Sequence, residues 1–117
     1  EHILAGHDLS KTGDVAATLA GSIAKVLGAK LTLAHAWQMP MELQLAHGRV
    51  SDEEHARRLA AHTGRLRAEL VKHVPEGVEP TVWLHQHGPE DGLVAAIEEG
   101  NPDLVVIGSA ARRLVLE

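Results

Sequence analysis

The sequence predicts an α/β fold, namely a single-domain, doubly wound (Rossmann-like) parallel sheet. Short apolar stretches of strand length alternate with stretches of helical periodicity along the whole chain. Residues 2–37 hold a strand, a helix and a strand, which make a βαβ unit with parallel strands because such crossovers are right-handed. Residues 103–109 are almost continuously apolar, as in a parallel strand that is covered on both faces. The length of 117 residues is that of one domain, which we place over residues 1–117.

The first βαβ unit is the clearest part of the pattern. Residues 2–7 are predicted to form a buried strand, and residues 31–37 a second one. Between them, a helix is predicted over residues 11–27, where Gly28 is placed for a left-handed C-terminal cap. The apolar residues of this helix recur at spacings of three and four: Val15, Ala16, Leu19, Ala20, Ile23, Val26 and Leu27.

The middle of the chain is predicted to be a loop followed by a helix. Residues 38–50 contain Pro40 and Gly48 and have no clear period, which indicates a loop. Ser51 and Glu54 have the spacing of a capping box and mark the start of the helix. Its apolar side is expected to carry Ala56, Leu59, Ala60, Thr63, Leu66, Leu70 and Val74.

The last third supplies two further strands and a helix, and it ends on a strand-like stretch. A strand is predicted over residues 81–85, and a helix opens at Gly88-Pro89, because proline is favoured in a first helical turn. After the apolar strand at 103–109, the strand-like residues 114–116 follow with no room for a crossover. The residues themselves therefore predict four strands and leave a strand-like stretch at the end of the chain.

Composition excludes several classes of function. Sixteen acidic residues against eleven basic ones give a net charge of −5, and two tryptophans are the only aromatic residues besides histidine. A nucleic-acid partner is therefore not expected, because it calls for a basic surface and stacking rings. The absence of cysteine excludes disulfides and thiolate metal sites and fits the reducing cytoplasm, where we place the protein. No apolar run reaches the ~18–20 residues of a membrane span.

Ligands of an open parallel sheet bind beyond the carboxyl ends of its strands. Asp8 and Ser10 follow the first predicted strand, and the carboxylate can accept hydrogen bonds from ribose hydroxyls or an adenine amine. Capping of the next helix by either residue is an equally weighted alternative. Gly108 and Ser109 close the most apolar strand, where backbone amides can approach an anion. The ordinary dinucleotide and P-loop fingerprints do not occur.

Three segments in this order resemble the universal stress protein family over nearly the full chain. ILAGHDLS at residues 3–10 is similar to that family's opening strand and its Asp and Ser. LTLAHA at residues 31–36 is similar to its second strand, and Gly88-Pro89 followed by DLVVIGS at residues 103–109 is similar to its most recognisable segment. The resemblance implies a five-stranded sheet, whose last strand we expect to be short or contributed at a dimer interface. It also implies a homodimer paired through that last strand and, in one branch, bound ATP or AMP, with or without Mg²⁺.

The resemblance also implies roles for individual residues. Asp8, with Ser10 after it, would contact the nucleoside, and Ala36 would lie near the adenine. The phosphates would be held by a loop patterned G-x-x-G, nine residues, then G-[ST], which begins here at Gly108 and Ser109.

The phosphate loop departs from the family pattern. Ala111 occupies the position of its second glycine, and the final G-[ST] and the helix after it do not follow. Either the loop is deleted, or a segment is missing between Arg113 and Leu114. We favour the missing segment, because a parallel neighbouring strand needs a crossover of a dozen or more residues.

The leading hypothesis is a regulatory stress-response domain that binds an adenine nucleotide. One alternative is a dimeric interaction protein of the same family without a nucleotide, which Ala111 favours modestly. Another is a metal-binding protein, because His85 and His87 have strand spacing and point to one face. His7 and His35 end the first two strands and are expected to lie close together. An enzyme is not expected beyond slow ATP hydrolysis, since no G-x-S-x-G motif occurs.

Overall fold

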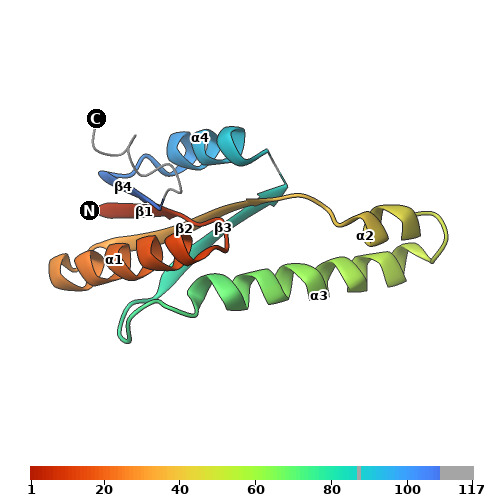
Figure 1. Cartoon of the computed structure of the whole chain (residues 1–117), viewed down its shortest axis with the longest axis horizontal. Coiled ribbons are helices and arrows are strands. Elements are labelled where there is room, and N and C mark those ends of the chain that lie inside the picture. The colour runs from red at the N-terminus through yellow and green to blue at the C-terminus, as the bar shows by residue number, and fades with distance from the viewer. Residues whose placement is uncertain (87, 109–117) are drawn as a thin grey trace.

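In the computed structural model, the described residues include four parallel strands, which form one sheet in the order β3-β2-β1-β4 (Figure 1). The structure describes residues 1–86 and 88–108. The strands are β1 (His2–Gly6), β2 (Lys30–Trp37), β3 (Pro80–Gln86) and β4 (Leu104–Ile107), and the helices are α1 (Lys11–Leu27), α2 (Met41–Ala46), α3 (Asp52–Val71) and α4 (Pro89–Gly100). All three strand pairings are parallel, which confirms the predicted α/β class.

Helices cover both faces of the sheet, and the sheet divides the core into two parts. Figure 1 shows α4 on one side of the sheet and α1 and α3 on the other. The α1 side contains Ile3, Ala5, Ala17, Ala20, Ala24, Leu31, Leu33 and Leu70, and the α4 side contains Leu4, Ala34, Trp83 and Ala96. The chain leaves β1 toward β2 on one side and returns to pair β4 on the other side. The order therefore reverses at the carboxyl end of β1, where α/β sheets place their ligands.

The bounds predicted for α1 are confirmed, but its predicted apolar stripe is wrong in part. Gly28 caps the helix in the left-handed conformation, with φ 65°. The side chains of Val15, Leu19, Val26 and Leu27 are exposed, whereas the buried face consists of alanines and glycines. Small residues face the sheet because they let the helix approach it closely, which the apolar spacing alone does not show.

The segment predicted to be a loop contains the helix α2, so that prediction is wrong. Met-Glu-Leu-Gln-Leu-Ala are good helix formers, and Glu42 lies in the favourable first turn. The Gln44 side chain donates to the carbonyl of Met39 (2.6 Å), and His55 of α3 contacts the carbonyl of Leu43 (3.2 Å). Contacts with α3 thus support a six-residue helix that is too short for its periodicity to be detected.

Helix α3 is anchored mainly at its carboxyl end. Figure 1 shows it extending past the carboxyl ends of the strands together with α2. Leu70 is its one buried residue, whereas Ala56 and Ala60, placed on the apolar face by the sequence, are exposed. The prediction of a continuous core face is therefore wrong, because the amino-terminal part of this helix projects beyond the sheet that would cover it.

The predicted capping box at the start of α3 forms in one direction only. Ser51 is the N-cap, and its hydroxyl accepts from the backbone N–H of Glu54 (3.1 Å). The Glu54 carboxylate binds Arg57 and Arg58 on the same helix instead of returning to the backbone of Ser51.

Replacing Ser51 by alanine is expected to loosen the first turn of α3 by about 1 kcal/mol, because the cap is lost. Amide hydrogen exchange of residues 52–55 should accelerate about fivefold, since local opening controls exchange there. Ser22→Ala, at an exposed position within α1, is the matched control and should leave these amides unchanged. An unchanged rate in Ser51→Ala would show that the hydroxyl does not cap the helix.

Strand β4 does not show the two-sided cover expected of a central strand. In the part of the chain that the structure describes, β4 pairs with β1 alone, and Leu104 and Ile107 are 42% and 50% exposed. The predicted fifth strand at 114–116 and the segment expected between Arg113 and Leu114 fall outside the described residues. Both remain predictions.

Candidate functional site

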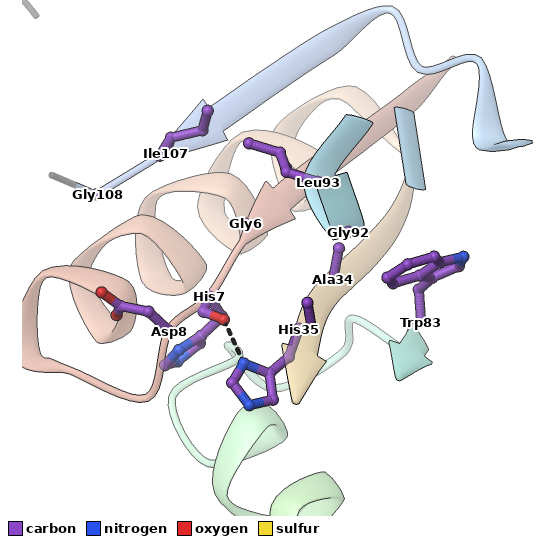
Figure 2. A pocket seen from close by; sticks show the side chains of 11 residues that line it. Gly6, His7, Asp8, Ala34, His35, Trp83, Gly92, Leu93, Ile107 and Gly108 are labelled. Atoms are coloured by element: carbon purple, nitrogen blue, oxygen red, sulfur yellow. Dashed lines mark hydrogen bonds between the residues drawn. The ribbon is translucent and has the colours of Figure 1, made fainter. Parts of the chain in front are cut away.

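A pocket of about 330 Å³ opens at the carboxyl ends of β1, β2 and β4 (Figure 2). This volume lies near the lower end of the ~300–1,000 Å³ range of small-molecule sites. Helix α4 supplies one wall and the turn after β1 another. The lining residues are Gly6, His7, Asp8, Ala34, His35, Ala36, Trp83, Gly92, Leu93, Ile107 and Gly108.

Asp8 supplies the carboxylate of the pocket. Its Oδ1 accepts from the backbone N–H of Ser10 (3.0 Å) and from the Ser10 hydroxyl. The hydrogen bond from that hydroxyl lowers the pKa of Asp8, so the group is ionised at neutral pH. Among the described residues, Oδ2 has no hydrogen-bond partner, which leaves it able to accept from a ligand hydroxyl.

Ser10 is the N-cap of α1 and lies next to the pocket without lining it. Its hydroxyl accepts from the backbone N–H of Gly13 (3.2 Å) and lies 2.8 Å from Oγ1 of Thr12. Of the two alternatives open from the sequence, helix capping therefore describes Ser10, while Oδ1 of Asp8 holds the capping residue. A direct contact of Ser10 with a ligand remains a prediction.

His7 lies directly behind Asp8 and is buried. Its Nδ1 accepts from the backbone N–H of Leu9 (2.9 Å). Its Nε2 lies 3.2 Å from Oδ1 of Asp14. Burial outweighs the two carboxylates, Asp14 and Asp8, and lowers the pKa of His7 below its ordinary value. The neutral ring is therefore the predominant form at neutral pH.

His35 and His7 lie close together, as predicted. The contact is between the His35 ring and the backbone of His7. Nδ1 of His35 lies 2.7 Å from the carbonyl oxygen of His7, a contact drawn as a dashed line in Figure 2. Because a carbonyl oxygen only accepts, Nδ1 must carry the proton of a neutral His35. This bond ties the end of β2 to the turn that carries Asp8.

Gly108 is required by a close approach of two backbones. A Cβ at this position would lie 2.0 Å from the carbonyl oxygen of Thr12 in α1. The end of β4 therefore packs directly on the first turn of α1, next to the cap at Ser10. Glycine also keeps this rim of the pocket open to a ligand.

Trp83 and Leu93 form the apolar part of the pocket. The Trp83 indole is nearly buried, donates through Nε1 to the Glu99 carboxylate (3.2 Å), and stacks on His85 with ring centroids 4.4 Å apart. Leu93 of α4 lies against Gly6, where a Cβ would come within 3.3 Å of it. Sequence reasoning missed both residues, and the one indication of Trp83 was its place in a strand that ends at the predicted ligand edge.

The structure brings Asp8, Ala36 and Gly108, predicted from three separate segments, into one pocket. Ser109 and Ala111 fall outside the described residues, so their predicted part in the site is untested.

The hypothesis of a metal pair of His85 and His87 remains a prediction, because His87 lies outside the described residues. Among the described residues, no three histidine or acidic side chains are placed to hold a metal ion. No helix in the described chain is both long and apolar enough to cross a membrane.

Comparison with known proteins identifies a family. The model of the universal stress protein family matches residues 1–117. No curated protein sequence matches the chain significantly.

Solved structures of the same family share the fold. A universal stress protein in complex with cAMP is 21% identical with a TM-score of 0.60, and the match covers 100% of this chain and 85% of that one. Universal stress protein UspA from Lactobacillus plantarum is 21% identical with a TM-score of 0.53, over 94% and 79% of the two chains. A universal stress protein from Archaeoglobus fulgidus DSM 4304 is 23% identical with a TM-score of 0.59, over 92% of this chain and 32% of that chain. At these identities, the likeness establishes the fold.

Proposed function

Because the chain belongs to the universal stress protein family, we propose that it binds an adenine nucleotide, ATP or AMP, in the carboxyl-end pocket and acts as a regulatory domain in the stress response. The observation that carries this proposal is the convergence of Asp8, Ala36 and Gly108 on that pocket. A structurally similar family member in complex with cAMP supports an adenine nucleotide as the ligand class.

The chemistry of the pocket suits a nucleoside. Oδ2 of the ionised Asp8 would accept from a ribose hydroxyl, a charge-assisted hydrogen bond. The indole of Trp83 and the side chain of Leu93 would pack on the base, and the small Ala36 leaves room beside it. A volume of about 330 Å³ suits the nucleoside better than the whole nucleotide. The phosphates, with or without Mg²⁺, would extend past Gly108 toward Ser109 and Ala111.

Asp8→Asn is expected to weaken ATP and AMP binding by about tenfold or more, the range of a lost hydrogen bond to a charged group. Asparagine can still accept from Ser10 through Oδ1, but its amide N–H₂ replaces the oxygen that would receive the ribose hydroxyl. Isothermal titration calorimetry measures the effect. The two nucleotides should lose affinity to the same extent, because Asp8 is assigned to the nucleoside.

Asp52→Asn, in the first turn of α3, is the matched control and should bind as the wild type does. Wild-type protein that gives no heat with either nucleotide at millimolar concentration contradicts nucleotide binding. That result would favour the alternative of an interaction protein of the same family.

The remaining parts of the proposal concern assembly and location. We place the protein in the cytoplasm as a homodimer paired through the predicted last strand at residues 114–116. In the described structure, Leu104 and Ile107 of β4 are partly exposed. Such apolar edge residues are commonly covered in an assembly. Light scattering at micromolar concentration distinguishes a dimer from a chain of 12.5 kDa.

A further inference from the structure

The buried side chain of His7 holds the turn between β1 and α1, together with the hydrogen bonds from Ser10 to Asp8. Leu9 has φ 67°, in the left-handed region that residues with a Cβ seldom occupy. The backbone N–H of this residue is bonded to Nδ1 of His7. Asp8 lies between the two residues that make this bond, so the bond fixes the part of the backbone from which the pocket carboxylate projects.

The bond requires one protonation state of His7. Nδ1 can accept from Leu9 only while it carries no proton, so the proton of the neutral ring is on Nε2, the atom 3.2 Å from Asp14. A protonated ring would carry N–H on both nitrogens, and Nδ1 would then face the Leu9 N–H as donor against donor. Protonation therefore removes the bond that offsets the unfavourable conformation of Leu9.

The ring itself has little room to move away. It is buried, and a Cβ on Gly13 of α1 would lie 2.5 Å from Nδ1, so the helix packs directly on the ring. The backbone carbonyl of His7 is also fixed, because it accepts a hydrogen bond from Nδ1 of His35. The exposed turn, Asp8 and Leu9, is thus the part that can rearrange when the bond is lost.

We propose that His7 is a pH-sensitive latch on the turn that carries Asp8: the neutral ring holds the carboxylate in its binding position, and the protonated ring releases it. The consequence for the ligand rests on the proposed function, since it assumes that Asp8 contacts the nucleoside. The pocket then loses affinity as the pH falls, and binding is coupled to acid stress.

Four titratable groups face the latch. Asp14 of α1 and Asp8 favour the protonated ring, whereas burial, the largest influence, and His35 of β2 oppose it, so that the pKa is lowered. His73, which follows α3, lies 3.5 Å from Oδ2 of Asp14 and shares that carboxylate. Because the pKa is lower in the folded protein, release occurs below the ordinary value of about 6.5, not at neutral pH.

Nuclear magnetic resonance of the wild-type protein without a ligand tests the latch directly. As the pH is lowered from about 7.5, the ring nitrogens of His7 should titrate with a midpoint below about 6.5. The amide resonances of Asp8 and Leu9 should follow with the same midpoint, and the protection of the Leu9 amide against exchange should fall at least about tenfold. A His7 ring that stays neutral until the protein unfolds, or a Leu9 amide that does not respond to its titration, would overturn the proposal.

Two variants assign the response to His7. His7→Asn keeps an oxygen acceptor near the position of Nδ1 but cannot titrate, so the Leu9 amide should become independent of pH. His73→Asn removes the other histidine beside Asp14 and should keep the response. A response that persists in His7→Asn, or disappears in His73→Asn alone, contradicts the assignment. If His7→Asn does not fold, the wild-type titration still decides the question.

The functional consequence is measured with adenosine, which has no group that titrates in this range. Wild-type affinity should fall at least about threefold once the pH is below the midpoint measured for the His7 ring, whereas that of His7→Asn should change by less than about twofold over the same interval. Equal affinity of the wild type above and below that midpoint would contradict release of the pocket. Adenosine that binds at neither pH contradicts the proposed function instead, and the ligand-free titration of Leu9 then tests the latch separately.

Discussion

Trp83→Ala is expected to lower the free energy of unfolding by about 3–5 kcal/mol, the range for truncating a large buried aromatic side chain. The indole is 9% exposed and packs with Leu4, Ala34 and Ala96 in the core between the sheet and α4. The variant also loses the hydrogen bond from Nε1 to Glu99. Urea denaturation measures the change.

Trp83→Phe separates packing from hydrogen bonding. Phenylalanine retains most of the apolar contact and loses the N–H, so it should lose clearly less stability than the alanine variant. Equal losses would assign the effect to the hydrogen bond with Glu99. A loss under about 1 kcal/mol in Trp83→Ala would contradict the packed position that the structure gives this ring at the pocket wall.

Gly108→Ala is expected to destabilise the protein by about 1–3 kcal/mol, the usual range for overpacking. The added methyl group would lie 2.0 Å from the Thr12 carbonyl oxygen, so β4 and the first turn of α1 must separate. This displacement widens the pocket between Gly108 and Asp8, and nucleotide affinity should fall as well. Denaturation and calorimetric titration on the same sample measure both effects.

Gly64→Ala is the control for the change of residue type. Gly64 lies within α3, and a Cβ there meets nothing within 4 Å. Alanine should therefore stabilise the helix by up to about 1 kcal/mol. If Gly108→Ala were as stable as the wild type, the close contact of β4 with α1 would be contradicted.

The fold was predictable where periodicity and terminal residues agreed. Residues 2–37 showed a strand, a helix with a glycine cap and a strand, and the structure confirms all three. Helix α2 was missed because six residues show less than two full turns of periodicity. The exposed Ala60 of α3 was misplaced because spacing shows which residues share a face but not whether a sheet covers it.

The site was predictable where it followed from topology. Parallel strands bring their carboxyl ends to one edge, so Asp8, Ala36 and Gly108 could be selected before their positions were known. The part of His7 in holding the turn was not predicted, because its hydrogen bond to Leu9 depends on backbone angles that no spacing encodes. Leucine gives no indication of a left-handed turn, which normally favours glycine or asparagine.

Mapping of backbone amides during a titration with ATP tests the central claim most directly. The account predicts that the largest shifts occur at Gly6, Asp8, Ala36 and Gly108, which belong to three strand ends and one pocket. The amides of α2 and the projecting amino-terminal part of α3 should change little. Shifts confined to those helices, or none at saturating ATP, would contradict an adenine-nucleotide site at the carboxyl edge of the sheet.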